Sequence, residues 1–352
     1  MDRSLGARLT RLRVASQPTR PSIFKNEGLW GWIFVSPALI GLFVFLAIPI
    51  AMSVLVSLRD WSGITPPFES DFVGLDNYRE LVIDDGVRRK DFAISLRNNL
   101  YYVLGVVPVQ TFIALSLAVI LNQKRLKAKS FFRTAFYFPS ITSSIAVSLI
   151  FLFMFQTRGA VNAVLPIRDI NWLANANGVI HNLLGVVGVD SGPGWMNDTE
   201  FMSLSLWEWA SGPSIAMLSI MILVTWTTVG TFMLIFLAAL QNIPVSVDEA
   251  AELDGASWWQ RFRWVTVPMM KPTIVFVVTL GLIGTWQVFD QIFAISFGGP
   301  QKTTMTPAFL TYFQTFQNGE ASLGAAIAVL LFVIIMAFTL FQRWLMRDKD
   351  RL

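Results

Sequence analysis

The sequence predicts an all-α integral membrane protein with six transmembrane helices and both termini in the cytoplasm. Of its 352 residues, 54% are hydrophobic and 14% are charged, whereas a soluble domain carries about 25% charged residues. Six long segments contain no charged residue at all. Lysine and arginine are concentrated in every second connection between those segments, which is the pattern that orients membrane helices.

Each uncharged segment suits one crossing of the hydrocarbon core, which takes about 20 helical residues. In chain order the segments are residues 28–58, 98–123, 134–157, 209–247, 272–289 and 321–342. None is long enough for two crossings and a turn. The fourth has room for a span and its flanks. The fifth has only 18 residues, so we expect its helix to continue past Asp290.

The orientation follows from the basic residues. With the N-terminus in the cytoplasm, the inner segments hold 18 lysine and arginine residues and the outer loops hold 9. The outer loops are then residues 59–97, 158–213 and 298–320. Because the inner segments are also shorter in total, the reverse orientation is disfavoured.

The chain is therefore expected to divide into successive parts along the membrane topology. These are a basic cytoplasmic segment (1–29), a first transmembrane helix (30–58), an outer loop (59–97), a five-helix core (98–345) and a cytoplasmic tail (346–352). The first apolar run is too long for a cleaved signal peptide and is interpreted as a signal anchor. The leader before it places Leu5, Leu9 and Leu12 on one helical face, so it is either a helix on the inner leaflet or a disordered tail.

Composition excludes several classes of site. The chain has no cysteine and one histidine, His181, so disulfides, thiol chemistry and a histidine-rich metal site are excluded. The isoelectric point near 9.5 would suit nucleic acid, but the basic residues follow topology and do not form one patch. The outer loop 158–213 is long for a connection and is expected to fold as a small cap or interfacial helix.

The charged cassette, residues 243–271, is the most informative segment because it is polar and helix-forming between two apolar spans. Ser246 and Glu249 have the spacing of a capping box, in which each side chain bonds the other residue's backbone N–H. The helix that follows is expected to end at Gly255 in a left-handed conformation.

A second capping box is predicted at Ser257 and Gln260. Its helix carries Trp258, Phe262 and Val265 as an apolar stripe. Pro268 is expected to stop this helix and Pro272 to start the next span. Two interpretations remain open, namely a simple link between spans and a knob that docks into a cytoplasmic partner.

The cassette resembles the EAA loop of binding-protein-dependent ABC importer permeases. The matching residues are Glu249-Ala250-Ala251, then Gly255, then Val265-Thr266-Val267-Pro268, with valine in place of the usual isoleucine and leucine. Weaker similarities to the carbohydrate importers occur at residues 36–41, 72–78, 131–134, 171–173 and 287–291. The resemblance is to the permeases of glycerol-3-phosphate, lactose and maltose importers, and the long outer loop after Leu173 departs from their shorter common form.

The resemblance implies a set of partners. They are a second, different permease that completes a heterodimer, two ATPase subunits and an extracytoplasmic sugar-binding protein, in a bacterial or archaeal cytoplasmic membrane. Apart from these proteins only membrane lipid is expected as a partner, and no nucleic acid. The subunit would have no catalytic residue and bind no cofactor or metal, with ATP and Mg on the ATPase. In agreement, the chain has no G-x-x-x-x-G-K-[ST] phosphate loop.

The resemblance also implies how the cassette would work. It would seat in a groove of the ATPase, so that closure of the ATPase dimer rocks the spans between inward- and outward-facing states. Glu249 would make the polar contact and Gly255 would set the turn between two helices. The remaining coupling residues would be Ala250, Ala251, Asp254 and Pro268.

Polar side chains within spans indicate where substrate could pass, because they are costly in lipid and usually face a cavity or a partner. Gln287, Asp290 and Gln291 would share one helical face beside Trp286, a set that suits a sugar. Further candidates are Thr225, Trp226 and Gln110. Bonds between helices are the competing interpretation for Asp290 and Gln291, and Ser140, Thr142, Ser143 and Ser144 are interpreted as small-residue packing.

Two other functions compete with an importer permease. A secondary transporter would normally have more spans, often with repeat symmetry, and would not need the cassette. A membrane scaffold would not need the polar face near Trp286. The sequence does not identify the sugar.

Overall fold

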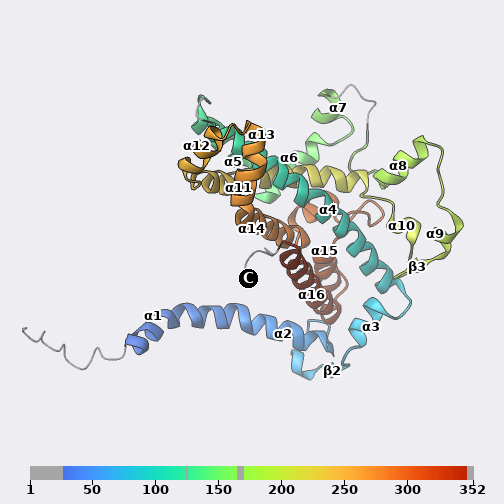
Figure 1. Ribbon diagram of the computed structural model, residues 1–352. Helices are drawn as coiled ribbons and strands as arrows, with labels where there is room; N and C mark the ends of the chain where they lie inside the picture. Colours follow the sequence, from blue (N-terminus) through green and yellow to red (C-terminus); the bar gives the residue numbers. More distant parts are fainter. Residues whose placement is uncertain (1–26, 124–125, 165–169, 347–352) are drawn as a thin grey trace, which may run out of the picture. The chain divides into compact units, whose positions relative to one another are not determined.

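The computed structural model describes residues 27–123, 126–164 and 170–346, and this part is mostly helical (Figure 1). The basic leader with Leu5, Leu9 and Leu12, and the tail 347–352, lie outside the described residues. Two compact units are distinguished, residues 1–52 and 53–352, and each is described by itself.

The first unit contains one long apolar helix. It consists of α1 (Glu27–Leu42), a π-helical turn η2 (Phe43–Ala47) and the start of α2 (Ile48–Ser57), and residues Gly28–Ser57 run without interruption for 30 residues. This agrees with the predicted segment 28–58 to within one residue. Its large side chains, such as Trp32, Phe34 and Phe45, are exposed, as expected for a helix whose solvent is lipid.

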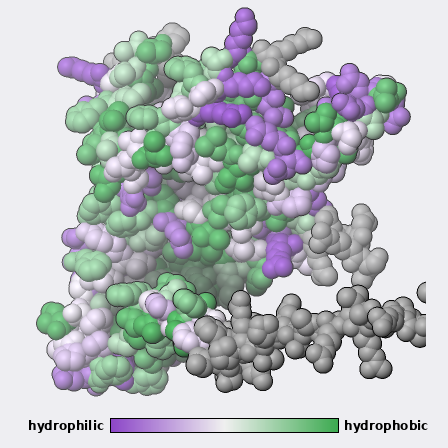
Figure 2. Space-filling view, turned by 90° about the vertical axis from the view of Figure 1, so that its left-hand side faces the viewer, coloured by the Kyte–Doolittle hydropathy of each residue, from purple (hydrophilic) through white to green (hydrophobic). Residues whose placement is uncertain are grey.

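Four long helices form the core of the second unit. They are α4 (Val87–Asn122), α11 (Ile215–Gln241), α14 (Val267–Trp286) and α16 (Ala321–Leu345). Helices α4 and α11 pack closely along their length, because Ala114 and Ala118 of α4 are fully buried against Phe232 and Phe236, and such small residues let two helices approach. Figure 2 shows hydrophobic side chains over much of one face of the molecule.

The predicted third span is a broken helix. Helices α5 (Lys129–Ile141) and α6 (Ser144–Met154) meet at 97°. Thr142 and Ser143 leave the helix with ψ angles of 147° and 127°. Among the described residues, five other helices are long and apolar enough to cross a membrane. The number is six if the pair α5 and α6 counts as one span.

The fifth span differs from the prediction at both ends. Helix α13 (Trp258–Arg261), the π-helical turn η4 (Phe262–Thr266) and α14 form one continuous helix of 29 residues, Trp258–Trp286. The predicted stop at Pro268 is wrong because the helix continues through this proline, which comes two residues after the end of the π-helical turn η4. The predicted start at Pro272 is also wrong, since this proline lies inside the helix.

The predicted continuation past Asp290 is wrong as well, because α14 ends at Trp286 and residues 287–289 are not helical. A hairpin of short helices follows, formed by η5 (Ile292–Ser296), α15 (Pro307–Tyr312) and η6 (Phe313–Gln317). The span instead gains its length on the side of the charged cassette.

The segments before and between the long helices contain short elements. Residues 59–86 hold β1 (Arg59–Asp60), η3 (Pro67–Glu69), β2 (Asp71–Phe72) and α3 (Asp76–Val82), with β1 and β2 antiparallel. The insert, residues 158–213, holds α7 (Ala160–Val164), α8 (Val179–Val186), α9 (Gly194–Asp198), the antiparallel pair β3 (Glu200–Phe201) and β4 (Leu204–Ser205), and α10 (Leu206–Trp209).

Helix α4 begins eleven residues before the uncharged segment 98–123. Its charged first turns are held by ion pairs, because Arg88 contacts both Glu80 and Glu320, and Lys302 donates to Asp91 at 2.7 Å. Charged residues that are paired outside the apolar run can therefore extend a membrane helix beyond the limits that hydropathy sets.

Candidate functional site

The first half of the charged cassette is helix α12 (Val245–Leu253). It begins directly after Pro244, which has an extended backbone, and no side chain caps it. The predicted capping box at Ser246 and Glu249 is therefore wrong. Ser246 already lies within the first turn, so its hydroxyl is not at the position from which a cap reaches the N–H of Glu249.

The turn that ends α12 agrees with the prediction. Gly255 has φ +76°, and the two bonds of a Schellman motif are present, from Ala256 N–H to Ala251 O and from Gly255 N–H to Glu252 O, each 3.0 Å. A Cβ on Gly255 would meet no atom within 4 Å. Glycine is therefore favoured here by backbone conformation and not by lack of space.

The second half of the cassette starts as predicted. Ser257 Oγ accepts from Gln260 N–H at 3.4 Å, and Gln260 Oε1 accepts from Ser257 N–H at 2.7 Å. Trp258 stacks on Phe262 with ring centroids 5.7 Å apart. The capping box therefore fixes the start of the 29-residue helix that continues into α14.

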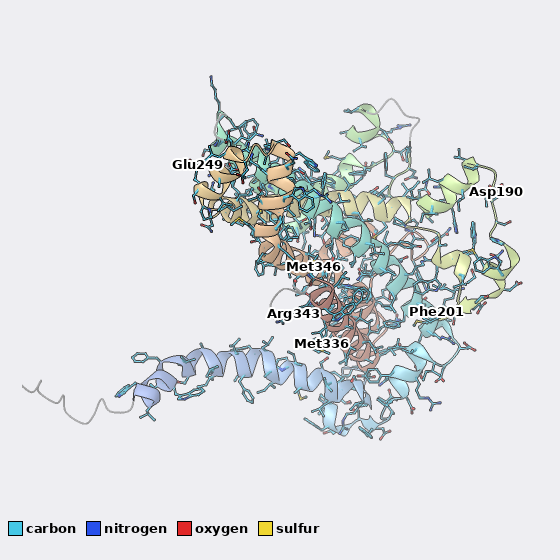
Figure 3. All side chains as sticks on the ribbon, viewed as in Figure 1. Asp190, Phe201, Glu249, Met336, Arg343 and Met346 are labelled. Atoms are coloured by element: carbon cyan, nitrogen blue, oxygen red, sulfur yellow. The ribbon has the colours of Figure 1, made fainter. Side chains whose placement is uncertain are left out.

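One arginine joins the two halves. Arg261 lies 3.0 Å from Glu252 and 3.6 Å from Asp248. Glu249 is exposed on α12 (Figure 3) and has no hydrogen-bond or ion-pair partner among the described residues. The four acidic groups are thus divided. Asp248 and Glu252 hold the cassette together, whereas Glu249 and Asp254 have no such partner among the described residues and are free to meet another molecule.

The cassette also exposes large apolar side chains. Leu253 is 90% exposed and Trp264 is 71% exposed, and Trp258 and Trp259 are exposed as well. Several large exposed apolar side chains on one short segment favour an interaction site. A depression of about 290 Å³ lies beside the turn and is lined by Asp254, Gly255, Arg261 and Trp264 among others.

A central polar cavity of about 260 Å³ lies where helices α5 and α6 meet, beside α11. Its lining is mainly hydroxyl-bearing and comprises Pro139, Ser140, Thr142, Ser144, Ser148, Leu223, Thr227, Thr228, Thr231, Phe232 and Gln291. Ser140 Oγ donates to Thr227 O at 2.6 Å, and Ser144 donates to the carboxylate of Asp290. Non-helical backbone in a membrane helix is tolerated where it lines such a cavity.

The predicted polar face of the fifth span is not formed. Because the helix ends at Trp286, the spacing of Gln287, Asp290 and Gln291 no longer places them on one face. Trp286 is 2% exposed and packs against Phe338. Gln287 and Asp290 are exposed, and only Gln291 lines the central polar cavity.

The other predicted path residues lie near the cavity but do not line it. Gln110 is buried and accepts a hydrogen bond of 2.7 Å from Thr228, which does line it. Thr225 is half-buried, and Trp226 is exposed with its ring 5.4 Å from Phe151.

The hydroxyl groups of α5 and α6 were missed by the sequence prediction, which assigned Ser140, Thr142 and Ser144 to packing. A signal was present, since Pro139 is followed by five residues of which four carry hydroxyls, and such residues compete with helical hydrogen bonding. Among the described residues, no group of three histidine or acidic side chains is arranged to hold a metal ion.

Comparison with known proteins places this geometry in a family. Residues 110–351 match the binding-protein-dependent transport system inner membrane component. The lactose transport system permease protein LacF of Rhizobium radiobacter is 31% identical over 335 residues, which cover 94% of this chain and 98% of LacF. The multiple sugar-binding transport system permease protein MsmF of Streptococcus mutans is 31% identical over 313 residues, 89% of this chain and 93% of MsmF.

The fold has a counterpart among solved structures. The crystal structure of a bacterial ABC transporter involved in the import of the acidic polysaccharide alginate contains a chain that aligns with a TM-score of 0.63 at 20% identity, covering 93% of this chain and 98% of that one. The long helices, the charged cassette and these matches agree, and the chain belongs to the family of binding-protein-dependent transport system inner membrane components.

Proposed function

We propose that this chain is the permease subunit of an ATP-binding-cassette importer for a sugar or sugar derivative. The named relatives transport lactose or multiple sugars, and the hydroxyl-lined cavity suits a polyhydroxylated substrate. The chain lies in a bacterial or archaeal cytoplasmic membrane with both termini inside, as the distribution of its basic residues favours.

The observation that carries the proposal is the shape of the charged cassette. Its Schellman turn, capping box and Arg261 bridges make a preformed knob, while Glu249 has no hydrogen-bond or ion-pair partner among the described residues and Leu253 and Trp264 stay exposed. A knob with unpaired carboxylates and exposed apolar surface suits a cleft on a soluble protein. That protein is an ATPase subunit, which supplies the ATP and Mg chemistry.

In this mechanism Glu249 makes the polar contact with the ATPase. Ala250 and Ala251 allow close approach, Asp254 and Gly255 shape the turn, and Pro268 lies where the second cassette helix becomes α14. Closure of two ATPase subunits moves the cassette. Because that helix continues without interruption to Trp286, the movement reaches the region of the central polar cavity directly.

The substrate path runs through this region and is completed by a second, different permease. Gln291 and Thr228 contact the central polar cavity from this chain. The exposed Gln287, Asp290 and Trp226 face the shared part of the path, Thr225 lies beside it, and Gln110 and Trp286 support it from the core. An extracytoplasmic binding protein delivers the sugar.

Co-purification and ATPase assays test the proposal. The chain, expressed with its partner genes, is expected to purify with an ATPase subunit whose activity in liposomes rises when a sugar-loaded binding protein is added. Uptake by this chain alone, driven by an ion gradient and without an ATPase, would identify a secondary transporter and overturn the proposal.

A further inference from the structure

A second polar cavity, of about 380 Å³, lies between the insert 158–213, the first turns of α4 and the loop before α15. We call it the insert cavity. Its volume falls within the range of small-molecule sites, roughly 300–1,000 Å³. Neither the coupling function nor the central polar cavity uses its residues.

The frame of the insert cavity is held by backbone hydrogen bonds. Ile215 N–H donates to Asn177 O at 3.2 Å, and Ile180 N–H donates to Ser211 O at 3.1 Å. Gly178 sits in this frame so closely that a Cβ would lie 2.2 Å from Ser211 O. The cavity is therefore preformed, which lowers the cost of ordering it around a ligand.

One wall carries a histidine of defined tautomer. The ring of His181 stacks on Trp207 with centroids 4.2 Å apart, and its Nε2 lies 3.1 Å from Trp207 O. Since a carbonyl oxygen only accepts, Nε2 carries the proton, and burial lowers the pKa of His181. The ring is thus neutral at pH 7, and its Nδ1 is a hydrogen-bond acceptor with no partner among the described residues.

A guanidinium without an ion-pair partner among the described residues also lines the cavity. Arg97 is half-buried and donates to Glu208 O at 3.3 Å and to Asn98 Oδ1 at 3.1 Å. No carboxylate lies within 4.0 Å of it in the described part of the chain. A guanidinium has five N–H donors, so several remain for a ligand.

The remaining polar side chains of the insert cavity include a carboxylate, which accepts hydrogen bonds, and amides, which both donate and accept them. Asp190 follows α8 (Figure 3), and its carboxylate has no hydrogen bond or ion pair within the described ranges. The side-chain amides of Asn177 and Asn182 are also unused there. Donors and acceptors therefore face the same space, and neither sign of charge dominates it.

This set selects one ligand chemistry. A simple anion would meet the carboxylates of Asp190 and Glu208, and a simple cation would meet Arg97. Hydroxyl groups donate and accept at once, so a ring with several hydroxyls satisfies the whole lining. We infer that the insert cavity binds one ring of a saccharide at the outer side of the permease, before the sugar enters the membrane path.

The inference rests on the proposed function for the side of the membrane and for sugar as cargo, and it is tested by binding. The assembled importer in nanodiscs, without binding protein, is mixed with lactose, maltotriose, arabinotriose or digalacturonate. Hydrogen–deuterium exchange is then followed by mass spectrometry. At least one sugar is expected to slow exchange in both segments 176–182 and 208–214.

Two substitutions locate the site. Asp190→Asn and Asn182→Leu are each expected to raise the Kd of the bound sugar about tenfold, the effect of losing one hydrogen bond to a charged or well-placed group. Asp198→Asn, in the same insert but outside the cavity lining, is the matched control and keeps the wild-type Kd. Binding of digalacturonate alone would assign Arg97 to a sugar carboxylate and still support the site.

The two proposals fail in different ways. Absence of protection by all four sugars, or an unchanged Kd in both substituted proteins, overturns the saccharide site whether or not the wild type imports sugar. A complex in which a sugar protects these segments, but which imports sugar only when an ion gradient is present, contradicts the proposed function and supports the site.

Discussion

The charged cassette and the central polar cavity are built in opposite ways. The cassette takes its shape from residues that are close in sequence. Each bond that defines it joins residues at most thirteen positions apart, the longest being the ion pair of Arg261 with Asp248. The cavity brings together α5, α6, α11 and the segment after α14. The shape of the cassette can therefore be predicted from the local sequence, whereas the cavity forms only when the long helices pack.

The comparison also separates two roles of polar groups in a membrane protein. In the cassette, polar groups satisfy each other locally and leave two carboxylates, Glu249 and Asp254, without a partner among the described residues. Around the cavity, polar groups join different helices, as when Ser140 of α5 donates to Thr227 O of α11. Substitutions in the first region should disturb assembly and coupling, and those in the second should disturb substrate handling.

The largest effect is expected from Glu249→Lys. Reversing the one acidic group of α12 that has no partner in the described chain should lower import about 100-fold, in line with the roughly 2–5 kcal/mol cost of disrupting a buried charged contact at an interface. Uptake of labelled sugar by reconstituted vesicles measures it. Glu200→Lys, an equal reversal at an exposed position of the insert, is the control, and equal losses in both would remove the special role of Glu249.

A smaller loss is expected from Gly255→Val. A side chain at φ +76° costs about 1–2 kcal/mol, so the angle between the cassette helices changes and import falls about tenfold. Gly255→Asn should retain most activity, because asparagine tolerates this conformation. Import that is equally reduced by both substitutions would mean that the side chain obstructs a partner and that backbone strain is not the cause.

The cavity is tested by Gln291→Leu, which should raise the KM for import about two- to tenfold through the loss of one hydrogen bond to substrate. The maximal rate and the ATPase activity should change little. Gln317→Leu, an exposed glutamine of η6, is the matched control. A wild-type KM in the Gln291 variant would exclude this side of the cavity from the substrate path.

The smallest effect is expected from Ser257→Ala, which removes one cap worth about 1 kcal/mol. Amides of residues 258–262 should exchange hydrogen about fivefold faster, as followed by mass spectrometry. Ser246→Ala should leave exchange in α12 unchanged, since this serine does not cap its helix. Faster exchange in α12 of that variant would restore the capping role first expected for Ser246.

Local chemistry explains what could be predicted. The first apolar helix, the capping box at Ser257 and the left-handed Gly255 depend on neighbours in sequence. Local sequence patterns were therefore sufficient to predict them. The box at Ser246 failed although its spacing was right, because Pro244 starts the helix earlier. Sequence spacing thus identifies a possible cap, and the preceding residue decides whether it is used.

Long-range packing explains what could not be predicted. The end of α14 at Trp286 depends on burial of that ring against Phe338, which no local pattern encodes. Beside the break after Ile141, Ser140 donates a hydrogen bond to Thr227 O on the distant helix α11. Likewise, hydropathy could not locate the start of α4, since its first turns depend on ion pairs with Glu80, Glu320 and Lys302.

The continuity of the helix from Trp258 to Trp286 has a mechanical consequence. Its 29 residues make a rod about 43 Å long at 1.5 Å per residue, with no flexible joint between the knob at one end and the broken-helix region at the other. Force applied at the knob is therefore delivered as tilt and axial rotation of the whole rod. The π-helical turn at Phe262–Thr266 sets the angle, about the helix axis, between side chains at the two ends. These five residues therefore determine which way one end faces relative to the other.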